Sequence, residues 1–174
     1  MLKKDDLKEF DKMKIRCATI KDLEDITFVE SLCFPASEAA SKCEFEERIK
    51  CYGNHFWLLY EDDRLISFVD GMVTNKPDLE DDMYLNAAMH NEKGLWQMIF
   101  GVNTIPTHRH QGYAAKLIRC VIDDAYTQGR KGVVLTCKES LIEYYNKFGF
   151  KNEGISKSVH GNVIWYQMRL EFDK

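Results

Sequence analysis

The stretch that decides the fold is WQMIFGVNTIPTHRHQGYAAKLI, residues 96–118. Its first ten residues are mostly apolar and predict a buried strand over 96–105. Pro106 ends that strand, because proline has no N–H to give to a sheet ladder. Polar residues and then Gly112 follow, and apolar residues at helical spacing predict a helix over 112–129. A strand, a tight loop and a helix are therefore expected in immediate succession.

The loop before this helix has the features of an anion site. Gly112 can adopt a positive φ and leaves room for a ligand to approach the backbone. The first N–H groups of a helix have no partner within the helix, and the positive end of its dipole faces the same space. His108, Arg109 and His110 add positive character. Phosphate binding is the functional interpretation, and a glycine that only turns the chain is the alternative.

The rest of the chain alternates between strand and helix patterns. This order indicates the α/β class, with a central mixed β-sheet flanked by helices. We expect residues 1–174 to form one domain, with residues 1–13 as a short N-terminal extension. Residues 75–95 are polar and look irregular. The expected elements are strand 15–19, helices 21–34 and 37–52, a hairpin of strands 55–62 and 64–74, strand 96–105, helix 112–129, strand 132–137, helix 140–148 and strand 162–172.

The composition argues against several classes of protein. Hydrophobic residues make up 45% and charged residues 30%, as in soluble globular proteins. No apolar run approaches the ~20 residues of a membrane span, and the polar N-terminus lacks the apolar core of a signal peptide. We therefore expect a cytoplasmic protein with no membrane partner. The net charge of −4 argues against broad nucleic-acid binding.

The six cysteines do not form a recognisable disulfide or zinc pattern. Their spacings are wide, and no C-x-x-C pair occurs. No two pairs of cysteine or histidine ligands have the spacing of a zinc finger. We therefore expect most of the cysteines to be small buried residues, and no metal site.

Two segments resemble motifs of the GNAT superfamily of N-acetyltransferases. RHQGYA (109–114) is similar to the (Q/R)-x-x-G-x-(G/A) coenzyme A loop, and ESLIEYYNKFGF (139–150) is similar to the A-x-x-F-Y-x-K-x-G-F segment. The order of elements also resembles that superfamily over roughly residues 14–172. Within it, LIEYYNKFGF and FPASEAAS (34–41) look closest to the arylalkylamine (serotonin) acetyltransferase branch. The resemblance implies a GNAT-like fold with acetyl-CoA as cosubstrate.

The resemblance also implies where the coenzyme would bind. In such folds two neighbouring parallel strands separate and the coenzyme lies between them. The backbone of Val102, Asn103 and Thr104 would bind the pantetheine and polarise the thioester carbonyl. The loop amides and flanking residues would hold the pyrophosphate and adjoining parts of the coenzyme. These residues are Arg109, His110, Gln111, Gly112, Tyr113, Ala114, Ala115 and, with less support from the motif, Asn146.

Tyr145 falls at the general-acid tyrosine of the superfamily and would protonate the departing thiolate. The sequence offers a separate reason to consider it. Tyr144 and Tyr145 are adjacent on a short predicted helix, so their side chains point about 100° apart. One of them can pack while the other faces a cleft, although two packing aromatics are the simpler alternative.

The general base stays open. The serotonin branch uses two histidines on the strand before the loop, and the aligned positions here are Met98 and Phe100, which cannot accept a proton. Glu30, on a predicted helix, and Asp70, a carboxylate in an apolar strand, are the candidates. A chain of ordered waters, or an amine that arrives neutral, would make a base unnecessary.

These features predict an N-acetyltransferase that moves the acetyl group of acetyl-CoA onto a primary amine by direct attack. We expect a small-molecule acceptor, which the acidic run 80–82 could help to attract. A peptide or protein N-acetyltransferase is the alternative within the same chemistry. A non-catalytic, acetyl-CoA-binding regulatory module is the alternative of another class. Members of the superfamily often join through the final strand, so a homodimer is also considered.

Overall fold

The computed structural model describes residues 12–173. Its strands form a four-stranded sheet in the order β1-β2-β3-β6 and a five-stranded sheet in the order β4-β5-β7-β9-β8. The strands are β1 (Met13–Arg16), β2 (Phe56–Glu61), β3 (Arg64–Asp70), β4 (Val73–Thr74), β5 (Trp96–Ile99), β6 (Gly101–Thr104), β7 (Gly132–Cys137), β8 (Lys151–Ile155) and β9 (Tyr166–Glu171). The helices are α2 (Leu23–Cys33), α3 (Lys42–Tyr52), α4 (Asp82–Leu85), α5 (Tyr113–Thr127) and α6 (Ile142–Asn146).

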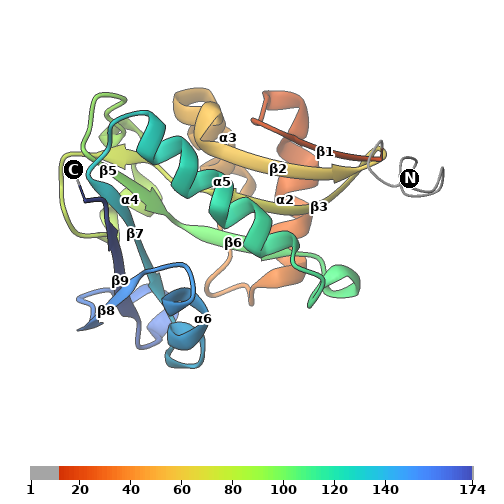
Figure 1. The fold of residues 1–174 in the computed structure, drawn as a ribbon. Coiled ribbons are helices and arrows are strands. Elements are labelled where there is room, and N and C mark those ends of the chain that lie inside the picture. Colours follow the sequence, from red (N-terminus) through yellow and green to blue (C-terminus); the bar gives the residue numbers. More distant parts are fainter. Residues whose placement is uncertain (1–11, 174) are drawn as a thin grey trace, which may run out of the picture.

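The helices cover both faces of the first sheet. α5 lies across one face, and α2 and α3 lie on the other (Figure 1). Phe45 of α3 is fully buried and meets Phe56 and Phe68 of the sheet edge to edge, with ring centroids 6.3 and 5.9 Å apart. The expected mixed α/β architecture is therefore confirmed, because β5 and β7 are parallel while the other strand pairs are antiparallel.

The strand expected over 96–105 is two strands. β5 pairs with β7, whereas β6 pairs with β3 in the other sheet. Phe100 separates them, and its N–H donates to the Asp70 carbonyl at 2.7 Å. β6 and β7 therefore leave in different directions, as the green and blue strands of Figure 1 show.

The hairpin of β2 and β3 is confirmed, with its turn at Asp62 and Asp63. The strand expected over 64–74 ends at Asp70, however, and Val73–Thr74 forms β4 in the other sheet. The second helix, however, begins later than residue 37. Ser41 is its N-cap and forms a capping box with Glu44, in which each side chain bonds the backbone N–H of the other residue. Residues 75–95 are also more regular than expected, since α4 and a 3₁₀ turn at Ala87–Met89 lie within them.

The structure differs from the expected elements at three further places. β8 was not predicted, because it is mostly exposed and polar and so lacks the alternation of a half-buried strand. β9 begins at Tyr166 rather than at residue 162. The first strand spans Met13–Arg16 rather than 15–19, and residues 1–11 of the expected N-terminal extension lie outside the described residues.

The cysteines are less buried than expected. All six are free, but only Cys137 is buried, while Cys17, Cys43 and Cys51 are exposed. Among residues 12–173, no helix combines the length and the hydrophobicity that a membrane span needs.

Candidate functional site

A cavity of about 210 Å³ opens where β6 and β7 separate. Phe100, Gly101 and Val102 line one side of it. Residues 135–138, from β7 and the residue after it, line the other side. Side chains from α2, α3 and α6 complete the walls. The change of sheet at Phe100 therefore creates a space that a continuous sheet would close.

The edge of β6 that faces away from β3 has no strand partner among the described residues. The register with β3 and the alternation of an antiparallel ladder turn the backbone of Val102 and Thr104 away from β3. Arg109 Nε already donates to the Thr104 carbonyl at 3.1 Å. The backbone of Asn103 faces β3 instead, and its carbonyl accepts a hydrogen bond from Ser67 Oγ at 2.6 Å. This geometry favours Val102 and Thr104 as coenzyme contacts and does not favour Asn103, which was expected with them.

The predicted loop lies at the end of β6 and leads into α5. Gly112 is the N-cap of α5 with a φ of 87°, a left-handed conformation that favours glycine. No side chain caps the helix, and its first backbone bond runs from the Lys116 N–H to the Gly112 carbonyl at 3.0 Å. The amides of residues 113–115 consequently have no partner within the helix. Among the described residues, nothing lies within 4 Å of a Cβ built on Gly112, so there is open space beside the start of α5.

Tyr145 lines the cavity from α6 and is 6% exposed. Its ring packs edge to face on Tyr144 and Phe150, with centroids 5.2 and 6.0 Å away. Burial raises the pKa of the Tyr145 hydroxyl above its ordinary value, so that the hydroxyl stays protonated and can act as a proton donor. Asn146 follows on the same helix but is exposed, and its side chain lies 3.5 Å from Glu143.

Both candidate bases line the same cavity, but their surroundings differ. Asp70 forms a buried ion pair with Arg48, with Oδ2 and Nη1 3.1 Å apart. Glu30 accepts a hydrogen bond from the Ala40 N–H through Oε1 at 3.2 Å, and its buried Oε2 has no hydrogen-bond partner among the described residues. Burial, assisted by the negative charge of Asp70, raises the pKa of Glu30 to about 7.

Polar side chains surround Gly101 at the cavity. A Cβ built on it would lie 3.1 Å from Asn103 Nδ2, 3.4 Å from Asp70 Oδ1 and 3.8 Å from Glu30 Oε2. Three polar side chains from α2, β3 and β6 thus converge around a residue without a side chain. Asn103 is fully buried beside these carboxyls, and its amide moderates the rise in the pKa of Glu30.

The lining of the cavity includes an aromatic wall, defined as Tyr84, Phe100, His160 and Trp165. The ring of Tyr84 lies between those of Phe100 and His160, with centroids 4.9 and 4.8 Å away. His160 is joined to Trp165 in turn, through the Trp165 Nε1–H bond to its carbonyl at 2.8 Å. Sequence reasoning missed Tyr84 and Trp165, because only long-range folding brings their segments to β6.

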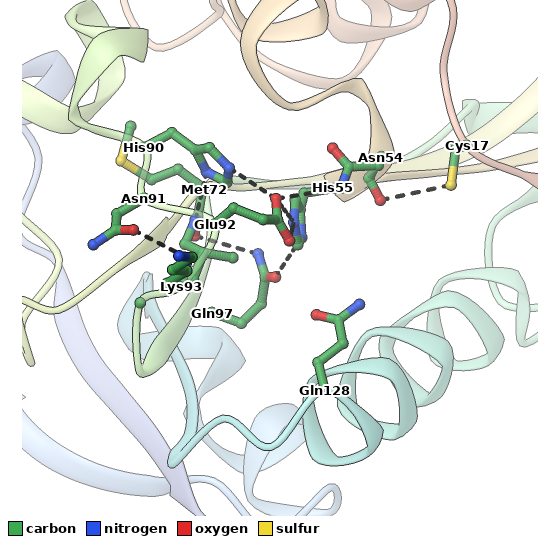
Figure 2. Close-up of polar contacts among 12 residues, drawn as sticks. Cys17, Asn54, His55, Met72, His90, Asn91, Glu92, Lys93, Gln97 and Gln128 are labelled. Atoms are coloured by element: carbon green, nitrogen blue, oxygen red, sulfur yellow. Dashed lines mark hydrogen bonds and ion pairs between the residues drawn. The ribbon is translucent and has the colours of Figure 1, made fainter.

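A second polar cluster, His55, His90 and Glu92, lies apart from this cavity (Figure 2). Gln97 donates to the carbonyl of Met98 at 2.9 Å, so its Oε1 accepts from His55 Nδ1 at 2.8 Å. His90 Nδ1 accepts from the Val73 N–H at 3.1 Å, so in neutral His90 the proton is on Nε2, which faces Glu92 at 3.0 Å. Three such groups could hold a metal, but this proton on His90 occupies the lone pair that a metal would need.

The acidic run at residues 80–82 borders a different hollow, of about 300 Å³, between residues 78–81 and 153–158. Glu80 pairs with Lys76, and Asp81 accepts hydrogen bonds from Ser158 and Val159. This run therefore has structural partners, and its suggested attraction for an amine stays a prediction.

Known proteins share the fold and part of the sequence. The human protein N-acetyltransferase 8 is 29% identical over 129 residues, which cover 72% of this chain and 49% of that protein, so the chain spans about half the length of this curated relative. The structure is similar to the loading GNATL domain of CurA from Lyngbya majuscula, with a TM-score of 0.80, 18% identity and coverage of 91% of this chain and 97% of that one. It is also similar to Arabidopsis thaliana Naa50 in complex with the bisubstrate analogue CoA-Ac-MVNAL, with a TM-score of 0.72, 16% identity and coverage of 92% and 99%.

Identities of this size between structures establish the fold alone. The model of the acetyltransferase (GNAT) family, however, matches residues 23–150, which are more than half of the sequence. These residues include β6, the loop before α5, and Tyr145. The chain therefore belongs to the acetyltransferase (GNAT) family.

Proposed function

We propose that the protein transfers the acetyl group of acetyl-CoA to a primary amine by direct attack, and that the acceptor is a small molecule. The observation that carries this proposal is the cavity at the divergence of β6 and β7, which has Glu30 and Tyr145 in its lining. A base and an acid on one cavity are what amine acetylation needs, because the amine loses a proton and the thiolate gains one.

The residues present fit a coenzyme that runs along β6. The outward backbone groups of Val102 lie at the cavity, and β6 leads from there to the loop at Gly112. The free amides at the start of α5 and the open space beside Gly112 suit a pyrophosphate. When bound there, acetyl-CoA supplies an activated thioester. The backbone N–H of Val102 would then stabilise negative charge on the carbonyl oxygen of the thioester.

Glu30 is the better of the two base candidates. Its pKa of about 7 leaves it about half ionised at neutral pH, and its free Oε2 can take a proton from an entering ammonium. Asp70 is committed to Arg48, so its role is to position Arg48 and to raise the pKa of Glu30 by its charge. Tyr145 keeps its proton until the thiolate departs.

Release of free CoA thiol tests the proposal. Acetyl-CoA is mixed with pools of arylalkylamines, aliphatic amines, amino acids and peptides, and wild type is compared with Tyr145→Phe. At least one pool should stimulate thiol release, and the variant should lower kcat by about 10²-fold or more with little change in KM, since the hydroxyl acts in the transition state. Equal kcat values in wild type and Tyr145→Phe would remove the acid role of Tyr145.

The same assay separates the other readings. Peptide acceptors deserve inclusion because Naa50, of the same fold, was solved with a bisubstrate analogue whose name includes a peptide sequence. Stimulation by arylalkylamines would support the branch resemblance of residues 34–41 and 141–150. A non-catalytic module would bind acetyl-CoA and release no thiol with any pool.

A further inference from the structure

The lining of the cavity carries more negative than positive groups. Its carboxylates are Glu30, Glu38, Glu44 and Asp70, and its permanent cations among the described residues are Arg48 and Lys138. Both cations already have carboxylate partners: Arg48 pairs with Asp70 at 3.1 Å, and Lys138 pairs with Glu38 at 2.9 Å. Each permanent cation of this cavity is therefore already neutralised by a carboxylate, although Arg48 Nε has no hydrogen-bond partner among the described residues.

Glu38 is held in place as a second acidic group. It is 8% exposed, and its Oε2 is buried without a hydrogen-bond partner among the described residues. Its carbonyl accepts a bond from His160 Nε2 at 2.8 Å. The backbone of Gly161 packs so closely on Glu38 that a Cβ there would lie 2.7 Å from Glu38 Cγ. A buried carboxylate oxygen fixed in this way lacks one donor.

Glu38 also lies beside the aromatic wall. His160, which bonds the Glu38 backbone, belongs to that wall, and Lys138 Nζ lies 5.8 Å from the centre of the Trp165 ring. Aromatic faces next to a carboxylate favour an organic cation, because both attract positive charge. Glu30, with its own unpartnered oxygen, faces the same cavity. Two carboxyl groups, each with one oxygen that has no hydrogen-bond partner among the described residues, therefore line the same cavity.

We propose that the acceptor is a short diamine, with one amino group at Glu30 and the second ammonium held by Glu38 Oε2 against the aromatic wall. This inference rests on the proposed function, because the reacting nitrogen is the one at Glu30. It assigns Glu38 to acceptor specificity and excludes amines that carry a carboxylate near the amino group.

Matched acceptors test the inference. The α,ω-diamines from diaminopropane to diaminohexane are compared with the monoamines and the ω-amino acids of the same chain length. The best diamine should exceed its monoamine in kcat/KM by about ten- to hundredfold, as expected for one hydrogen bond to a buried charge. The ω-amino acid should be poorer than the monoamine, since its carboxylate would meet Glu38.

Two variants should move this preference in opposite directions. Glu38→Gln removes the charge that holds the second ammonium and should bring the ratio of diamine to monoamine close to one. Lys138→Met removes the cation that competes for Glu38 and should raise the ratio. Glu24→Gln, an exposed position on α2 that pairs with Lys42, is the control and should leave the ratio unchanged. Thermal unfolding of all three variants checks that they are folded.

Binding to the CoA-loaded protein, measured by calorimetry, separates this inference from the proposed function. Diamine binding that Glu38→Gln weakens about tenfold, without turnover, would support the recognition and refute the transfer reaction. Turnover in which diamines, monoamines and ω-amino acids perform alike would support the transfer and overturn this inference. A ratio that Glu38→Gln and Lys138→Met both leave unchanged would also overturn it, and absence of both binding and turnover would overturn both proposals.

Discussion

Replacing Glu30 by glutamine should make the protein more stable and less active at the same time. Burial and the charge of Asp70 raise the pKa of this carboxyl from its ordinary value of 4.5 to about 7 in the folded protein. A carboxyl with a raised pKa stabilises the fold below its unfolded pKa, and this contribution is lost as the pH rises through the folded pKa. The shift corresponds to about 3 kcal/mol, so an ionised Glu30 costs about that much above pH 7.

Glutamine resembles the protonated carboxyl and cannot ionise. Glu30→Gln should therefore raise the free energy of unfolding by up to about 3 kcal/mol near pH 8.5, and the gain should shrink toward zero near pH 4.5. Urea denaturation at several pH values measures the difference. Glu24→Gln, on the exposed side of the same helix, should change stability by no more than about 0.5 kcal/mol at any pH.

The activity should respond in the opposite sense. If an ammonium enters and Glu30 takes its proton, log kcat/KM of the wild type rises with unit slope below about pH 7 and then levels off. Glu30→Gln should lower kcat/KM at neutral pH by about 10²- to 10⁴-fold. Its profile should keep rising above pH 7, because only the neutral fraction of the amine can react.

Either of two results would refute this reasoning. A break near pH 7 that persists in Glu30→Gln would mean that another group controls the profile. A stability difference between Glu30→Gln and wild type that does not grow between pH 4.5 and pH 8.5 would mean that folding does not raise the pKa of Glu30.

Three further predictions concern the loop, the buried ion pair and the core. Gly112→Ala should cost only about 1–2 kcal/mol of stability for its positive φ but weaken CoA binding by at least about tenfold in calorimetry, because its methyl group would enter the open space at the N-terminus of α5 where we propose that the pyrophosphate binds. Arg48→Met should cost about 3–5 kcal/mol by leaving Asp70 unpaired, and adding Asp70→Asn should restore more than half of that in chemical denaturation. Phe45→Ala should cost about 3–5 kcal/mol in the same assay, because the ring is fully buried between two others.

Local signals in the sequence were sufficient for the elements with strong periodicity. The succession of strand, loop and helix around Gly112 is confirmed, because a proline, a glycine and an apolar stripe each act over a few residues. The start of α3 was misplaced although its signal was present. Ser41 has a glutamate three residues later, as a capping box requires, whereas Ser37 is followed at that distance by Ala40.

The break at Phe100 could not be predicted from local pattern. The run from Trp96 to Ile105 is mostly apolar, and its pattern does not mark a change of sheet. The break is fixed by partners far along the chain, since Asp70 pairs with Gly101 while Leu135 pairs with Ile99. Strand pairing over such separations is a property of the tertiary fold, which local periodicity does not record.

The parts of the candidate site that depend on single residues could be predicted from the sequence. Tyr145 and Glu30 were named from motif and residue type, and the structure places both on one cavity. Arg48 and Tyr84 were not named, because a charged or aromatic residue on a surface-like helix gives no signal of burial. Their roles arise only where α3 and α4 come together at Phe100, with Arg48 Nη2 donating to the Tyr84 carbonyl at 2.9 Å.

The change of sheet at Phe100 links the fold to the chemistry. Because β6 diverges from β7, the backbone groups on its outer edge have no strand partner among the described residues. An open strand edge of this kind can pair with another chain, but it can also form hydrogen bonds with a ligand that lies along it. Because the next residue is Gly101, no side chain fills the opening toward Glu30 and Asp70. Phe100 and Gly101 thus open the cavity toward Glu30, whose buried carboxyl has a pKa of about 7. A buried carboxylate that can serve as a base lowers the stability of the fold. We therefore expect Glu30→Gln to raise the free energy of unfolding and to lower kcat/KM.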